Sequence, residues 1–67
     1  RGMVIQWNDY EIYLSPRMGV IATKWLQAGR YESWHCLDGH WNETPPDDLL
    51  DWYKRRIMDT GMVAVGD

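Results

Sequence analysis

Turn signals recur at short, even intervals along most of this chain and constrain its fold more than any other feature. They are Asn8-Asp9, Pro16–Gly19, Ala28-Gly29 and Asp38-Gly39. The runs between them are rich in β-branched and aromatic residues and span 4–7, 10–14, 20–26, 31–37 and 40–43. Strands joined by such short turns pair with their sequence neighbours. The pattern predicts a small antiparallel β-meander of four to five strands.

Pairing residues across each turn sorts the apolar side chains onto one face of the expected sheet. Across the successive turns, the expected pairs include Trp7 with Tyr10, Leu14 with Ile21, Trp25 with Glu32 and Cys36 with Trp41. The apolar face then holds Met3, Ile5, Trp7, Tyr10, Ile12, Leu14, Ile21, Trp25, Trp34, Cys36 and Trp41. Because side chains alternate between faces, a slip of one residue would turn a strand's apolar set to the other side.

A helix is expected over residues 46–60, which makes the fold class α+β. Pro46 suits the first helical position, and the aspartates that follow suit the positive end of the helix dipole. Apolar side chains share an arc of about 100°, and these are Leu49, Leu50, Tyr53 and Ile57. Trp52 lies outside that arc. The tail Met62–Val65 is expected to add a short strand or to fray.

A second interpretation stays open for residues 16–28, where apolar residues also recur at helical spacing. Helix 16–28, hairpin 31–43 and helix 46–60 would form a winged-helix-like α-ββ-α fold. Four segments then resemble excisionase-type winged helices: Lys24-Trp25-Leu26, Gly29-Arg30, Gly39-His40-Trp41 and Leu49–Arg56. The resemblance implies a DNA-binding accessory factor that contacts nucleic acid through Arg30, Lys54, Arg55 and Arg56.

Composition narrows the class of protein. One domain over residues 3–67 is expected, with Arg1-Gly2 a cloning remnant ahead of Met3.

Seven Lys and Arg against ten Asp and Glu give a net charge of -3, which disfavours a general nucleic-acid or anionic-membrane binder. The single cysteine, Cys36, excludes an intrachain disulfide and favours a cytoplasmic location.

Residues with metal-binding or nucleophilic chemistry cluster at one place, namely His35, Cys36, Asp38 and His40. Zinc needs three or four converging ligands. Adjacent residues of a strand point to opposite faces, so His35 and Cys36 diverge. We therefore expect no metal, no cofactor, no catalytic residue and no enzymatic activity.

The tryptophan content points to binding. A five-stranded sheet is about 19 Å wide and one helix about 10 Å, so half of the aromatic face needs another cover. We expect a small, non-enzymatic intracellular protein that acts by protein–protein contact and forms a homodimer. Accessory or inhibitor proteins of phages and mobile elements have this character. The candidate contact residues are Trp7, Trp41 and Trp52.

Overall fold

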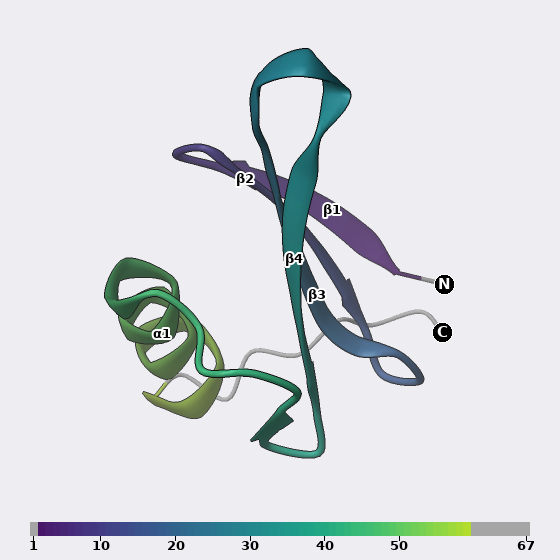
Figure 1. Ribbon diagram of the computed structural model, residues 1–67. Coiled ribbons are helices and arrows are strands. Elements are labelled where there is room, and N and C mark those ends of the chain that lie inside the picture. The colour runs from purple at the N-terminus through teal and green to yellow at the C-terminus, as the bar shows by residue number, and fades with distance from the viewer. Residues whose placement is uncertain (1, 60–67) are drawn as a thin grey trace.

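The computed structural model describes residues 2–59 and shows a five-stranded antiparallel sheet with one C-terminal helix (Figure 1). The strands, paired in sequence order, are β1 (Met3–Trp7), β2 (Tyr10–Ser15), β3 (Gly19–Trp25), β4 (Tyr31–Leu37) and β5 (His40–Trp41). Helix α1 (Asp47–Tyr53) continues as a π-helical segment, η2 (Lys54–Asp59), and a single 3-10 turn, η1 (Gln27–Gly29), lies between β3 and β4. The predicted meander with a C-terminal helix is confirmed. The expected tail strand Met62–Val65 lies outside the described residues.

The first and last hairpins have the predicted registers. Trp7 pairs with Tyr10 across the first turn, and Cys36 pairs with Trp41 across the last. Asp38 and Gly39 both have positive φ, 53° and 82°. Two positive φ values are what a type I′ turn requires, so the local turn chemistry fixes this hairpin.

The register of β3 differs by one residue from the prediction on both of its sides. Leu14 pairs with Val20 instead of Ile21, and Trp25 pairs with Tyr31 instead of Glu32. The two shifts compensate each other, so β4 keeps its predicted alignment with β2. Strand β3 alone has its side chains on the faces opposite to those predicted. The predicted inward positions of Ile21 and Trp25 are therefore wrong. Residues 19–25 are a strand, so the helix 16–28 of the winged-helix alternative is also wrong.

Ser15 explains the first slip. Its buried hydroxyl accepts hydrogen bonds from the backbone N–H groups of Arg17 and Met18, at 3.1 and 3.2 Å. These bonds hold the connection to three residues, and Gly19 with φ of 80° closes it opposite Ser15. A serine that bonds its own turn in this way is common, and it shortens the loop by one residue relative to the expected four.

The β3–β4 connection explains the second slip. Five residues, Leu26–Arg30, separate the closing pair instead of the expected tight turn at Ala28-Gly29. The Leu26 N–H donates to the Arg30 carbonyl at 2.7 Å, and Ala28 adopts a left-handed φ of 60°. The hydrogen bond between Leu26 and Arg30 therefore closes a loop that is wider than a two-residue turn. Trp25, which pairs with Tyr31, is the last residue of β3.

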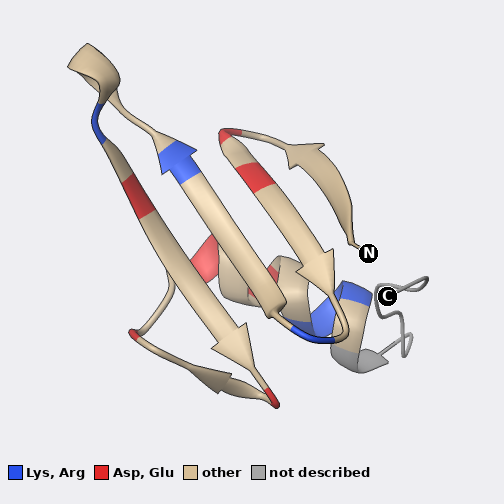
Figure 2. Cartoon of the chain, turned by 90° about the vertical axis from the view of Figure 1, so that its right-hand side faces the viewer, with Lys and Arg blue, Asp and Glu red and all other residues tan. Residues whose placement is uncertain are grey.

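Helix α1 lies on one face of the sheet, behind it in Figure 2, and the core fills the space between them. Its buried side chains are Tyr10, Ile12, Leu14, Val20, Ala22, Trp34, Cys36, Leu49, Trp52 and Tyr53. Trp52 is only 7% exposed, so its expected position off the apolar arc is wrong. The buried stripe is centred on Leu49 rather than on Leu50, and the long indole reaches the sheet from its margin.

Candidate binding surface

Four of the five tryptophans belong to the core. Trp34 and Trp52 are buried, and Trp7 and Trp41 are partly buried against the same cluster. Trp7 stacks on Tyr10 at 5.5 Å between ring centroids and contacts Trp52 at 5.9 Å. These contacts use the aromatic surface that the sequence assigned to a partner. The candidate contact residues Trp7, Trp41 and Trp52 therefore contribute mainly to packing between sheet and helix.

Trp41 packs by its ring edge. It meets Tyr53 at 5.2 Å between centroids, with the rings 77° apart, a geometry that aromatic pairs favour. Its indole Nε1 is buried without a hydrogen-bond partner among the described residues. A buried donor left unpaired costs stability, so this contact holds the β4–β5 hairpin to the helix by ring packing alone.

The exposed aromatic surface lies elsewhere, at the end of the β3–β4 hairpin. Trp25 is 58% exposed and its cross-strand neighbour Tyr31 is 59% exposed. Their ring centroids are 5.1 Å apart with planes tilted by 56°. Leu26 follows at 39% exposed. We call Trp25, Leu26 and Tyr31 the hairpin patch.

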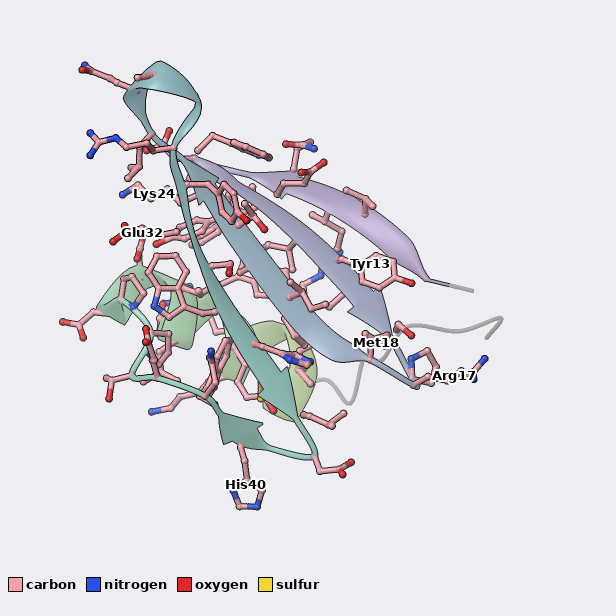
Figure 3. All side chains as sticks on the ribbon, turned by 45° about the vertical axis from the view of Figure 1, so that its right-hand side comes forward. Tyr13, Arg17, Met18, Lys24, Glu32 and His40 are labelled. Carbon is pink, nitrogen blue, oxygen red and sulfur yellow. The ribbon has the colours of Figure 1, made fainter. Side chains whose placement is uncertain are left out.

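The hairpin patch lies on the side of the sheet opposite the helix, because Trp25 and Tyr31 alternate with inward residues. The inward neighbours Lys24 and Glu32 face each other across β3 and β4 and point to the helix side (Figure 3). Lys24 Nζ lies 5.9 Å from the centre of the Tyr10 ring. Polar residues thus end the core beside the patch, and the Trp25 and Tyr31 rings contact each other outside it.

Sequence reasoning missed Trp25 because the register slip placed it in the core. One local signal pointed the other way. Alanine is not among the residues favoured at the first position of a type I′ turn, so Ala28-Gly29 is a weaker signal for a two-residue loop than Asp38-Gly39. A tryptophan at the last position of a strand beside a wider loop extends beyond the helix-covered part of the sheet.

A single hydrogen bond between side chains joins the sheet to the start of the helix in the described structure. The Tyr10 hydroxyl donates to Asp48 Oδ1 at 3.0 Å, and the Leu49 N–H donates to the same oxygen at 2.9 Å. Burial, together with the hydrogen bond to the Asp48 carboxylate, raises the pKa of Tyr10 to about 12. Tyr10 therefore acts as a neutral donor that positions α1.

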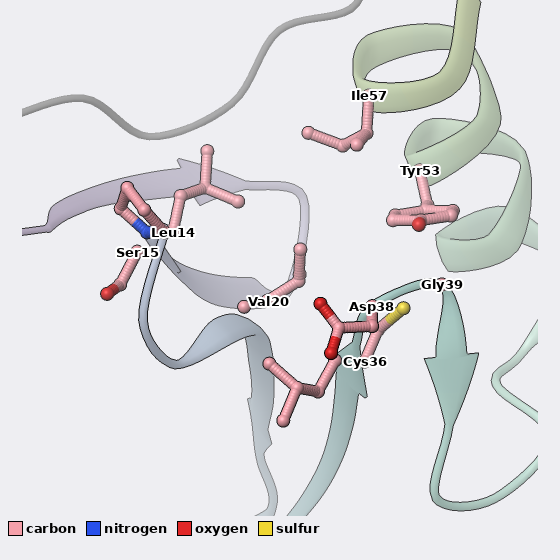
Figure 4. A pocket seen from close by; sticks show the side chains of 11 residues that line it. Leu14, Ser15, Val20, Cys36, Asp38, Gly39, Tyr53 and Ile57 are labelled. Carbon is pink, nitrogen blue, oxygen red and sulfur yellow. The ribbon is translucent and has the colours of Figure 1, made fainter.

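A cavity of about 210 Å³ lies between the two lower turns of the sheet and the helix (Figure 4). Apolar side chains of Leu14, Val20 and Ile57 border it, and the Cys36 thiol faces the Tyr53 hydroxyl there. The hydrogen bond with Cys36, together with burial, raises the pKa of Tyr53 to about 12. The cavity brings the thiol and the phenol together, and Asp38 also borders it.

The histidines do not converge with Cys36. His35 lies on the outer side of β4, where its Nε2 hydrogen-bonds the Met18 carbonyl, so that nitrogen carries the proton. Cys36 is buried on the other side, and His40 is exposed on β5 (Figure 3). Among residues 2–59 no three potential metal ligands come together.

The basic residues of the nucleic-acid alternative lie at two separate places (Figure 2). Arg30 is in the β3–β4 loop, and Lys54, Arg55 and Arg56 are in η2. Arg55 Nε pairs with Asp51 Oδ2 at 3.2 Å, and Arg56 lies 5.9 Å from the centre of the Trp52 ring. These four residues do not form one positive stripe.

No protein-family model, curated protein or solved structure matches this chain. Within the described part of the chain, no helix is long and apolar enough to cross a membrane.

Proposed function

We propose that this protein is a small, non-enzymatic binding module that acts inside the cell by docking the hairpin patch onto a partner protein. The observation that carries the proposal is the pair of exposed rings, Trp25 at 58% and Tyr31 at 59% exposed. Tryptophan and tyrosine are the residues most enriched where protein interfaces gain their binding energy. Rigid rings lose little conformational entropy when a partner covers them.

The position of the patch supports the same function. The β3–β4 hairpin extends beyond the part of the sheet that the helix covers (Figure 1). A partner can therefore reach the rings without displacing the core. Gln27 and Arg30 around the loop are exposed and supply a polar rim, which is the usual composition around an aromatic contact.

The DNA-binding alternative has less support. Its fold required a helix over residues 16–28, which is strand β3. Its basic residues are divided between the hairpin loop and η2, where Arg55 is paired with Asp51. Phosphate contacts on a duplex need cations that face the same groove.

The test compares three forms of the chain as bait in a lysate of the source cells. The first is the unmodified chain, and the second carries Trp25→Ala with Tyr31→Ala. The matched control carries Met18→Ala with Leu37→Ala, which removes apolar side chains exposed by 48% and 42% at the other end of the sheet. All three should unfold at similar temperatures, because the altered side chains lie outside the core.

We expect one stoichiometric protein bound by the unmodified chain and the control but lost from the Trp25→Ala, Tyr31→Ala form. Loss of about 2 kcal/mol or more per ring in a central contact corresponds to at least a thirtyfold weaker affinity. A partner that binds all three forms equally contradicts the assignment of the patch. Duplex DNA retained in a salt-dependent manner, and lost on Arg55→Ala with Arg56→Ala, would favour the alternative.

A further inference from the structure

Strand β1 leaves one edge of the sheet open within residues 2–59, because it pairs there only with β2. Its sequence, Met3-Val4-Ile5-Gln6-Trp7, contains no charged residue and no proline. Natural edge strands are usually protected from pairing by charges, prolines, bulges or a very short length. The pairing of β1 with β2 is regular over all five positions, so β1 uses none of these protections.

The opposite edge is protected. Strand β5 has only two residues, and Asn42 ends it by bonding β4. The His35 N–H donates to Asn42 Oδ1 at 2.9 Å, and the Asn42 N–H donates to the His35 carbonyl at 2.9 Å. Further along β4, Glu32 adds a charge. The contrast marks β1 as the edge that is available for pairing.

The backbone groups that β1 offers follow from its hairpin. In a two-residue turn the closing pair exchanges hydrogen bonds, and pairs alternate from there. Alternate residues of β1 therefore direct their backbone N–H and C=O groups to β2. The pairs are Trp7 with Tyr10, Ile5 with Ile12 and Met3 with Leu14. The N–H and C=O groups of Val4 and Gln6 point to the open edge.

We propose that two copies of this chain pair through β1 about a two-fold axis at Ile5, which joins their sheets into one. This is the antiparallel register in which all five residues of both strands pair. Val4 of one copy lies opposite Gln6 of the other, and these residues exchange the hydrogen bonds of the open edge. Ile5 lies opposite Ile5 and Met3 opposite Trp7. The inference is independent of the hairpin patch, which lies on β3 and β4.

The side chains are complementary in this register. On the helix side, Met3, which is 41% exposed, covers the exposed part of the partner copy's Trp7, and a thioether against an aromatic ring is favourable. On the outer side, Val4, 55% exposed, lies beside Gln6. No like charges face each other, a condition for stable cross-strand pairs. A contact of five residues per copy is below the usual size of stable interfaces, so we expect dimers that form at micromolar concentrations or above.

Disulfide trapping tests the axis. Ile5 bonds β2, so Ile5 opposite Ile5 is a non-hydrogen-bonded pair, whose Cα atoms lie about 4.5 Å apart. This distance permits a disulfide. Ile5→Cys should therefore give a covalent dimer under oxidised glutathione. Val4→Cys is the matched control, because its two copies are offset by two residues along the strands and exceed the limit of about 7 Å.

The unmodified chain is the second control, since its only cysteine, Cys36, is 2% exposed. No covalent dimer with Ile5→Cys, or equal yields with Ile5→Cys and Val4→Cys, would overturn the proposed register.

Removing one edge donor gives an independent measurement. Val4→Pro deletes the Val4 N–H at the open edge and spares the bonds to β2, a position that edge strands tolerate. Sedimentation from 1 µM to 1 mM should show dimers of the unmodified chain and a dissociation constant raised about tenfold or more in the variant. Val4→Thr keeps the N–H and should dimerise like the unmodified chain.

Hydrogen exchange distinguishes pairing of β1 between two copies from pairing of β1 with another segment of the same chain. The Val4 and Gln6 amides should be protected at high protein concentration and exposed at low concentration. If the chain is monomeric and both amides are protected throughout, another segment of the same chain pairs with β1, and the proposal is overturned.

Discussion

Tyr10 shows how one residue can serve packing and polarity together. Its ring is 2% exposed and lies between Trp7 and Trp34, at 5.5 and 6.1 Å between centroids. Its hydroxyl reaches Asp48 at the start of α1. The ring therefore belongs to the core of the sheet, while the hydroxyl fixes where the helix begins.

The raised pKa values of Tyr10 and Tyr53 predict a loss of stability in alkali. Both pKa values are about 12 in the folded chain against 10.0 for an ordinary tyrosine. The unfolded chain loses these protons first, so the contribution of the two tyrosines to the free energy of unfolding is constant below pH 10 and falls as the pH rises from 10 to 12. Urea denaturation at pH 9, 10, 11 and 12 measures it.

The Tyr10→Phe variant is the control for this pH dependence. It should be less stable than the unmodified chain at pH 9 by about 1–2 kcal/mol, because the Asp48 carboxylate loses a donor. Its free energy of unfolding should then fall less steeply between pH 10 and 12. Parallel curves for the two proteins would show that Tyr10 titrates normally.

At the scale of the strand, turn chemistry decided what the sequence could predict. Asp38 and Gly39 are residues that tolerate the positive φ of a type I′ turn, and that hairpin was predicted correctly. The β2–β3 register was missed because it depends on a bond from a side chain, Ser15 to its own turn. Helix 46–60 was predicted within a residue at its start, although the π-helical conformation of η2 has no signal in the local sequence.

The candidate site was harder to predict than the fold for the same reason. A shift of one residue moves Trp25 from the core to the surface, so a residue predicted to stabilise the fold becomes a candidate for binding. Trp52 was misplaced because a helical arc counts Cα directions, whereas a long indole can turn toward the sheet from the margin. Burial of large rings is decided by packing in three dimensions.

Gly19 and Gly39 provide a matched test of the β2–β3 turn. Both have positive φ, 80° and 82°, but a Cβ on Gly19 would collide with the Cys36 carbonyl oxygen, whereas nothing lies within 4 Å of one on Gly39. Gly39→Ala should cost about 1–2 kcal/mol for the left-handed backbone alone. Gly19→Ala should cost clearly more, because β4 must also move.

Urea denaturation of both glycine variants gives the comparison. Equal losses of stability would contradict the close approach of the β2–β3 turn to β4.

Across the whole molecule, the tryptophans divide into four that hold the helix to the sheet and one that faces solvent. Trp25 is 58% exposed, while Trp34 and Trp52 are below 9%. Acrylamide should therefore quench mainly Trp25. Trp25→Phe should remove most of the collisional quenching and shift the remaining emission to shorter wavelength. Trp41→Phe is the control and should retain the quenching. If Trp25 were buried, Trp25→Phe would retain it as well.

The order of elements also determines what a shortened chain would expose. The meander consists of neighbouring strands, whose contacts are local in sequence. Leu49, Trp52 and Tyr53, which cover its apolar face, follow all five strands. A chain cut before α1 would keep every strand but leave Ile12, Leu14 and Trp34 without their cover. Such a contiguous apolar face favours aggregation, so the C-terminal helix decides whether the sheet stays dispersed in water.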